Sequence, residues 1–385
     1  MGNLFSWWNI YLLPTVGIPS EYSDPERYGR ISTWGFARVT ESTFDNVPVG
    51  SLLYGYLPIG TLPVDFKLEP AEGRVKGNSK FEVVEKSPHR QTTLPIYNQY
   101  LVYRPNEAAE LISTPSNKDY LGWSSLMQVL FLTSWGINKF IFTRDKSILT
   151  PPSSMCLSWE VENADVIPNS VTIILSASTK TGLALAHQLR HARPLEEKPR
   201  LIIGVVSKKS FAFTVGTGLY DKIFTYDAVT KLDTLNEIVD PSTATISSTS
   251  NRVILFEFGS RGNAARDWFS ALKSHVEQSP LPSIPVIGFW VGSPPTVDEE
   301  PASEDGLQLI FTFINASDYL TPGKAKIGEE EYWKSFLHEW KQFVADGAVR
   351  GLSLQWGSSM DDVKTVWDTI CSDQIDARKG YVFEF

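Results

Sequence analysis

Cysteine, positive charge and uninterrupted apolar runs are all scarce in this 385-residue chain. The two cysteines, Cys156 and Cys371, form no C-x-x-C pair, which excludes a disulfide scaffold and disfavours a cysteine zinc site. A net charge of −9 disfavours nucleic-acid binding, which normally requires a basic surface. Gly, Asn and Lys interrupt the apolar stretch 122–142, so a buried helix pair is expected there rather than a membrane span. We therefore expect a cytoplasmic protein with neither a membrane nor a nucleic-acid partner.

What the chain contains is typical of a folded protein of two domains, with 42% hydrophobic and 21% charged residues. Short β-type runs between Pro- and Gly-containing turns predict a β-rich domain over residues 1–150. From about residue 165, short apolar runs alternate with helical patterns; these runs are 171–175, 201–206, 222–226, 252–256, 285–291 and 309–313. Continuous apolar strands between helices are typical of a parallel sheet that is covered on both faces. The sequence therefore predicts an α/β fold whose second domain, at 151–310, is a Rossmann-like doubly wound parallel sheet.

The segment 174–184, Ile-Leu-Ser-Ala-Ser-Thr-Lys-Thr-Gly-Leu-Ala, follows the first strand of that sheet. At this position a doubly wound sheet holds a dinucleotide pyrophosphate, because free backbone N–H groups and the positive end of a helix face the ligand. Small and hydroxyl-bearing side chains let a phosphate approach, and a lysine supplies matching charge. The predicted cofactor contacts are Ser176, Ala177, Ser178, Thr179, Lys180 and Thr181. An ordinary β–α turn capped by Ser or Thr is the alternative.

The second strand ends in Val-Val-Ser-Lys-Lys-Ser at 205–210, with no acidic residue nearby. An NAD site normally has Asp or Glu here for the ribose 2′-hydroxyl, whereas an NADP site has basic residues for the 2′-phosphate. We predict that Ser207, Lys208 and Lys209 hold the 2′-phosphate of NADPH. Two solvated lysines at the start of a helix are the alternative, although the positive helix end disfavours unpartnered lysines.

The other reactive side chains form no recognised catalytic or metal-binding motif. His187 and His191 lie four residues apart on one predicted helix without an evident third ligand, so a solvated helix and no metal site are expected. The absence of a G-x-S-x-G segment disfavours an α/β-hydrolase. Tyr56 and Tyr97, in the β-rich part, are candidate proton donors, and tyrosines packed in a core are the alternative.

Two further segments, 203–213 and 218–226, are similar to the second and third strands of medium-chain dehydrogenases/reductases. In that superfamily a G-x-D-x-V-x-x-Y-like run forms the third strand. Five segments carry a closer similarity, namely 33–39 with 54–58, 97–100, 130–134 and 176–181. Through them the chain resembles a bacterial and fungal family of unknown function at the edge of that superfamily, whose members include quinone oxidoreductases and enoyl reductases.

That resemblance implies a GroES-like β-rich domain at 1–150, completed by about 311–385, and a zinc-independent NADP-linked reductase, commonly a homodimer. It implies that Tyr226 lies near the adenine and that Phe258, Gly259 and Gly292 line the nicotinamide side. The fourth strand departs from the family pattern by ending Glu257-Phe258-Gly259, where relatives have Asp and a small residue before Gly. Relatives also carry an upstream Asn-Asn-x-Thr-Tyr-like segment, so a shortened N-terminus is expected.

These residues together predict an NADPH-dependent reductase of a small molecule that carries an activated alkene or a carbonyl. NADPH is expected in the cleft between the domains, with a tyrosine or water as proton source. The resemblance adds fungal natural-product biosynthesis as a context. Two alternatives stay open: an isomerase or lyase on the same fold, and a cofactor-free binding protein or remnant.

Overall fold

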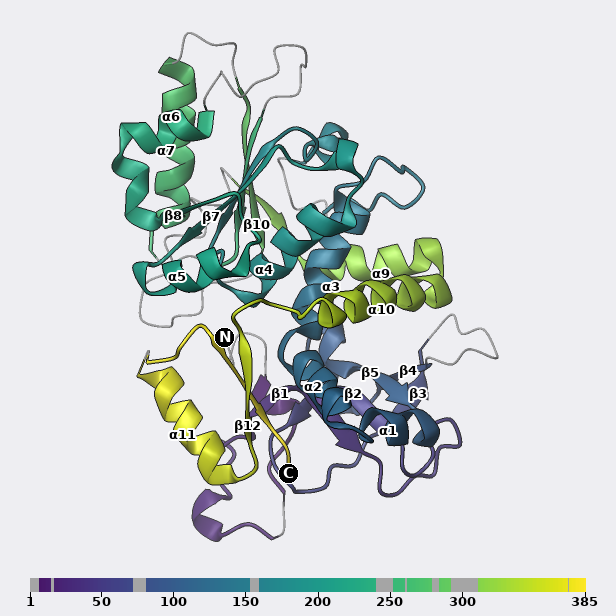
Figure 1. Ribbon diagram of the computed structural model, residues 1–385. Coiled ribbons are helices and arrows are strands. Elements are labelled where there is room, and N and C mark those ends of the chain that lie inside the picture. The colour runs from purple at the N-terminus through teal and green to yellow at the C-terminus, as the bar shows by residue number, and fades with distance from the viewer. Residues whose placement is uncertain are drawn as a thin grey trace. The chain divides into compact units, whose positions relative to one another are not determined.

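The computed structural model describes residues 7–14, 17–71, 81–152, 159–239, 252–259, 262–278, 284–291, 311–372 and 374–385. The chain divides into two compact units (Figure 1). Unit 1 comprises Met1–Val129, Gly328–Leu337 and Leu352–Phe385, and unit 2 comprises Leu130–Ile327 and His338–Gly351. The domain limits inferred from the sequence, near residues 150 and 310, stay a prediction.

Unit 2 contains a six-stranded parallel sheet in the order β11-β10-β9-β6-β7-β8. Its strands are β6 (Val171–Leu175), β7 (Leu201–Val206), β8 (Lys222–Thr225), β9 (Val253–Glu257), β10 (Val286–Val291) and β11 (Phe311–Ile314). β6, the first of these strands in the sequence, is central. β7 and β8 extend the sheet on one side, and β9, β10 and β11 extend it on the other. This is the doubly wound order of Rossmann-like folds.

Helices cover both faces of this sheet, which explains why its strands are continuous apolar runs. On one face Ile173 packs with Leu235 of α6 (Leu232–Val239) and Trp268 of α7 (Ala264–Gln278). On the other face Ile174 lies against α4 (Lys180–His187). Figure 1 shows α6 and α7 on the side of the sheet opposite α4 and α5.

Local sequence signals set the two ends of α5 in unit 2. In α5 (Lys208–Thr217), Ser207 caps the first turn and Gly218, with a φ of 70°, ends the last. The further helical segments are η7 (Val161–Asp165), η8 (Gln188–Ala192), η9 (Leu195–Glu197), η10 (Tyr226–Thr230), α9 (Ala316–Ile327) and the end of α10 (Glu329–Ala345). The expected helix pair at 122–142 was wrong, because the chain is helical without a break through α2 (Pro115–Trp123), η5 (Ser124–Gln128), α3 (Val129–Gly136) and η6 (Ile137–Ile141).

Unit 1 contains a five-stranded antiparallel sheet in the order β1-β2-β5-β4-β3. Its strands are β1 (Ser32–Arg38), β2 (Leu52–Pro58), β3 (Leu68–Pro70), β4 (Phe81–Glu85) and β5 (Gln99–Tyr103). Around them lie η1 (Trp7–Asn9), η2 (Ser20–Tyr22), η3 (Pro88–Arg90), η4 (Pro95–Asn98) and α1 (Pro105–Leu111), and the C-terminal part adds β12 (Ser353–Gly357), α11 (Met360–Cys371) and β13 (Lys379–Phe383). Leu53, Val83 and Val102 form the core on one face of the sheet, and Tyr54 and Leu101 on the other.

The predicted fold class is confirmed: a Rossmann-like doubly wound parallel sheet accompanied by a β-rich GroES-like part. Among the described residues, no helix has both the length and the apolar character needed to cross a bilayer.

Candidate functional site

The carboxyl end of β6 lies where the strand order of the parallel sheet reverses. β6 pairs with β7 on one side and β9 on the other, so that Leu175 is opposite both Val205 and Glu257. Open α/β sheets bind their ligands beyond this end of the strands, at such a switch point. The segment that the sequence predicts to hold a pyrophosphate begins at the next residue, Ser176.

The turn after β6 is held in one conformation by β7 and by Tyr220, which precedes β8. Ser176 has a φ of 56°, in the left-handed region that non-glycine residues seldom adopt. The Ala177 N–H donates to the Val205 carbonyl at 3.1 Å, and the Ala177 carbonyl accepts from the Tyr220 hydroxyl at 2.7 Å. Gly204 permits this packing, because a Cβ there would lie 3.1 Å from both Ala177 and Tyr220. The turn is therefore preformed.

The first turn of α4 presents unused backbone donors at this position. Thr179 caps the helix, since its side chain accepts from the Gly182 N–H at 3.2 Å. The N–H groups of Ser178, Lys180 and Thr181 have no acceptor among the residues that the structure describes. Successive free N–H groups at a helix N-terminus bind anions.

Lys180 adds a positive charge to this turn. Its side chain is half-buried and has no ion-pair partner within the described part of the chain. Burial lowers the pKa of the Lys180 ammonium, because removing a cation from water disfavours its charged form. A nearby anion would offset that cost.

The residues predicted to hold the 2′-phosphate, Ser207, Lys208 and Lys209, lie at the start of α5. Ser207 caps α5 by accepting from the backbone N–H three residues further on, at 3.3 Å. The Lys208 ammonium lies 3.0 Å from the carboxylate of Asp227, and both side chains are largely exposed. Hydrogen bonds from Thr225 and Lys208 lower the pKa of Asp227 to about 2. Lys208 thus has an ion-pair partner, and Lys209 follows it as an exposed residue of the same first turn.

Tyr226 connects the end of β8 to the turn after β6. Its hydroxyl lies 3.0 Å from the Ser176 hydroxyl, although the two residues are 50 positions apart. Its carbonyl accepts from the Trp268 indole at 3.0 Å, which fixes the backbone. Tyr226 therefore belongs to the same cluster as the predicted pyrophosphate contacts, and its proximity to an adenine stays a prediction.

The third group of predicted contacts follows β9 and β10. Phe258 is buried and stacks on Phe256 at 6.4 Å, and Gly259 has a φ of 91°, which favours glycine. Gly292 lies outside the described residues. Glu257 is only 3% exposed at the carboxyl end of β9, beside Leu175. In the sequence, Glu257 is distinguished only by its departure from a family pattern; the signal that could identify it is a charged residue at the end of an apolar strand.

Tyr56 and Tyr97 form a pair within unit 1. Tyr56 belongs to β2 and Tyr97 to η4, and their ring centroids are 4.7 Å apart. Trp34 packs against both rings, at 5.7 Å and 6.4 Å. Burial raises the pKa of both phenols, so both are neutral donors at ordinary pH. The structure thus brings together two residues that the sequence singled out separately.

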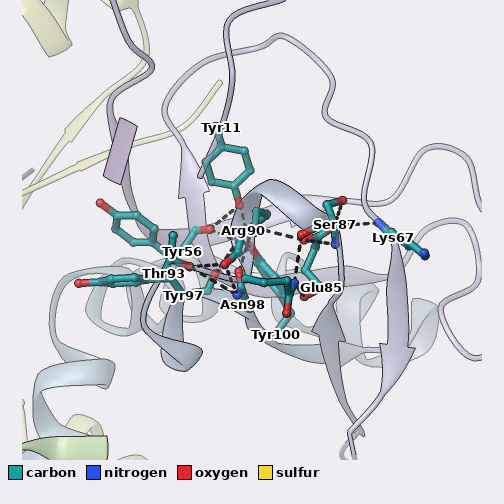
Figure 2. A network of polar contacts seen from close by, with 11 residues as sticks. Tyr11, Tyr56, Lys67, Glu85, Ser87, Arg90, Thr93, Tyr97, Asn98 and Tyr100 are labelled. Atoms are coloured by element: carbon teal, nitrogen blue, oxygen red, sulfur yellow. Dashed lines mark hydrogen bonds and ion pairs between the residues drawn. The ribbon is translucent and has the colours of Figure 1, made fainter. Parts of the chain in front are cut away.

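A buried polar network beside this pair was not found from the sequence (Figure 2). Arg90, 2% exposed, lies 3.4 Å from Glu85 and donates to the Asn98 side chain at 2.9 Å and to the Tyr100 hydroxyl at 2.6 Å. The Tyr11 ring lies 4.8 Å from the guanidinium carbon. These residues are distributed over almost 90 positions, so no local sequence motif identifies the network.

The expectation of a solvated face for the histidine pair was wrong for His187, which is 9% exposed. Its ring packs 4.8 Å from Phe343 and 4.7 Å from His191, and burial lowers its pKa to about 4. In the described ranges, no three His, Cys, Asp or Glu side chains gather at metal-binding distance.

The predicted site residues therefore fall into two groups, one in each unit. The turn after β6, the start of α5, Tyr226 and the residues after β9, Phe258 and Gly259, form the first group, in unit 2. The tyrosine pair forms the second, in unit 1. The functional role of each residue stays a prediction.

The strand order defines unit 2 as a Rossmann-like domain of doubly wound type. The chain itself belongs to the family described as "Protein of unknown function (DUF2855)", whose model matches residues 1–376. No curated protein matches the sequence.

Several solved structures are similar in fold at very low sequence identity. The CurK enoyl reductase is 10% identical with a TM-score of 0.43, over 100% of this chain and 84% of that chain. CurA from Vibrio vulnificus, in complex with NADPH, is 10% identical with a TM-score of 0.41, over 92% and 99%. A mutant enoyl thioester reductase from Candida tropicalis is 9% identical with a TM-score of 0.43, over 92% and 99%. At these values the similarities carry no functional conclusion.

Proposed function

We propose that this protein is an NADPH-dependent, zinc-independent reductase of an activated alkene or a carbonyl in a small molecule. The observation that carries the proposal is the preformed turn after β6. It combines small residues, free N–H groups at Ser178, Lys180 and Thr181, and a lysine without an ion-pair partner among the described residues, all at the switch point of a doubly wound sheet. Anionic dinucleotides fit this combination.

The residues present are compatible with a nicotinamide dinucleotide phosphate. The pyrophosphate is assigned to residues 176–181 and the 2′-phosphate to Ser207, Lys208 and Lys209. When bound, the nicotinamide supplies a hydride, and the reduction is completed by a proton that this chain or water provides. Tyr56 and Tyr97 are the proposed proton donors, because their phenol rings lie together, 4.7 Å apart, and each carries a hydroxyl proton.

A cofactor-free binding protein is the second candidate. The observation that favours it is that two proposed phosphate contacts already have partners within the chain. Lys208 pairs with Asp227, and the Ser176 hydroxyl pairs with Tyr226. A homodimer in the cytoplasm accompanies the reductase proposal as an expectation from the family resemblance.

Titration of the purified protein with NADPH and with NADH, followed by nicotinamide fluorescence, separates the two candidates. The reductase proposal predicts micromolar binding that favours NADPH. Lys208→Glu with Lys209→Glu should weaken NADPH at least tenfold and leave NADH nearly unchanged, because only NADPH carries the 2′-phosphate. A control with the same change in net charge is Lys146→Glu with Lys364→Glu, two exposed lysines elsewhere. Failure to bind either nucleotide would remove the reductase proposal and favour the binding protein.

A further inference from the structure

We propose that Tyr100, Arg90 and Tyr11 form a positioning network that fixes the backbone of Tyr56 and Tyr97. The chemical role of the two tyrosines rests on the proposed function. The geometry of the network rests on unit 1 alone, where all five residues lie. Figure 2 shows the two rings at the edge of the network, with their hydroxyl ends pointing away from Arg90.

The carbonyl of Tyr56 is the first point of attachment. β2 pairs with β5 only from Leu52 to Tyr54, so Tyr56 lies beyond the end of this ladder. Its carbonyl accepts instead from the Tyr11 hydroxyl at 2.5 Å and the Tyr100 hydroxyl at 3.1 Å. Two side-chain donors thus replace the missing strand partner and satisfy a buried backbone acceptor.

The carbonyl of Tyr97 is the second point of attachment. It accepts from Arg90 Nη2 at 2.7 Å, and it lies 3.3 Å from the Tyr100 hydroxyl, whose single proton is shared with the shorter contact to the Tyr56 carbonyl. The Tyr100 hydroxyl therefore contacts both carbonyls, and it also lies 2.8 Å from the Tyr11 hydroxyl. One phenol joins two chain segments that are otherwise separate in the sequence.

Arg90 is itself held on several sides, so the network is anchored. Its Nε donates to the Asn98 side chain at 2.9 Å, and the Asn98 amide donates back to the Arg90 carbonyl at 3.0 Å. Glu85, which is 1% exposed, lies 3.4 Å from Nε and balances the charge. Side chains fixed by such contacts hold functional groups more precisely than loops alone.

Two single substitutions separate the members of the network. Tyr100→Phe removes the hydroxyl that lies within hydrogen-bond distance of both carbonyls, so the rings of Tyr56 and Tyr97 should both become more mobile. Tyr11→Phe removes a hydroxyl that contacts the Tyr56 carbonyl and the Tyr100 hydroxyl but not the Tyr97 carbonyl, so the Tyr97 ring should keep its order. Tyr54→Phe is the matched control, because it removes a buried hydroxyl from the same strand, where Tyr54 donates to the Ser124 carbonyl at 3.1 Å.

Ring order is measured on the full chain by fluorine NMR, with a fluorinated tyrosine placed singly at position 56 or 97. We expect averaged or multiple signals at both positions in Tyr100→Phe, at position 56 alone in Tyr11→Phe, and an unchanged spectrum in Tyr54→Phe. Unchanged spectra in Tyr100→Phe and Tyr11→Phe would overturn the inference. Equal changes in Tyr54→Phe would also overturn it, because they would indicate general loosening of the sheet.

Activity provides an independent measurement. Tyr100→Phe should lower kcat by about tenfold through misplacement of the donor, and leave the NADPH Kd unchanged. A rise in Kd with constant kcat contradicts positioning. If the unsubstituted protein oxidises NADPH with no enone or ketone, the proposed function fails, and the fluorine spectra still decide whether the network orders the tyrosine pair.

Discussion

Gly55→Ala tests how closely the tyrosine network is packed against β2. A Cβ at this position would lie 2.3 Å from Tyr100 Cδ1 and 2.6 Å from Cε1, more than 1 Å inside van der Waals contact. The backbone carbonyl of Gln99 would be a further 3.1 Å neighbour. The Tyr100 ring is 1% exposed and its hydroxyl is hydrogen-bonded, so it has no free direction in which to move.

The expected loss in the free energy of unfolding follows from two contributions. Overpacking of a buried site costs about 1–3 kcal/mol. Displacing the Tyr100 ring also breaks one or two buried hydrogen bonds, each of which contributes about 1 kcal/mol. We therefore expect a loss of about 2–5 kcal/mol, measured by denaturant unfolding followed by circular dichroism.

Gly35→Ala is the matched control, because Gly35 is the residue directly opposite Gly55 in the β1–β2 ladder. A Cβ at Gly35 would meet only the Ser125 hydroxyl at 3.7 Å, which is an ordinary contact. This variant should stay within about 1 kcal/mol of the unsubstituted protein. Equal effects of the two substitutions, or an unfolding midpoint unchanged by Gly55→Ala, would refute the packing described for Tyr100.

Two further predictions concern the nucleotide contacts. Asp227→Asn should strengthen NADPH binding, because Lys208 loses a competing carboxylate 3.0 Å away. The expected gain is about two- to fivefold, the scale of an exposed ion pair, and NADH binding should not change. Weaker NADPH binding in the fluorescence titration would contradict this prediction. Burial lowers the pKa of Lys180 and a bound phosphate raises it, so affinity for NADPH should be greatest below the lowered pKa and fall as pH rises through it. Lys180→Gln should abolish that decline, and an identical pH profile in the variant would argue against a Lys180–phosphate contact.

The parallel sheet was predictable because burial on both faces gives each strand an unbroken apolar sequence. β12 was not found, because its sequence Ser-Leu-Gln-Trp-Gly is short and largely exposed, and resembles a loop. α9 was missed for a different reason. Pro322 and Gly323 normally end a helix, but here α9 continues through both, and the Gly323 Cα packs so closely on Phe140 that a Cβ would lie 2.8 Å from its ring. Tertiary packing outweighs local propensity there.

The candidate site likewise has parts that could be predicted from the sequence and parts that could not. The position of the turn after β6 was predictable because its residues are consecutive in the sequence and directly follow an apolar strand, whereas its role stays a proposal. The ion pair between Lys208 and Asp227 and the contact between Ser176 and Tyr226 were not predictable, because they form only when the sheet places β8 next to β7 and one strand away from β6. The Arg90 network is the extreme case, since it joins segments from Tyr11 to Tyr100.

Two neighbouring residues, Tyr226 and Asp227, are the present partners of two proposed phosphate contacts, Ser176 and Lys208. A nucleotide that binds there must displace these partners. A phosphate that binds Lys208 exchanges the single charge of Asp227 for the charge of about −1.5 to −2 carried by a phosphomonoester. One that binds Ser176 exchanges a neutral hydroxyl of Tyr226 for a charged acceptor, and charge-assisted hydrogen bonds are stronger. In both exchanges the binding free energy of the phosphate comes mainly from its greater negative charge rather than from additional contacts. The preference for NADPH over NADH should therefore decline as salt screens the exposed lysines, and a preference independent of salt would show that it arises elsewhere.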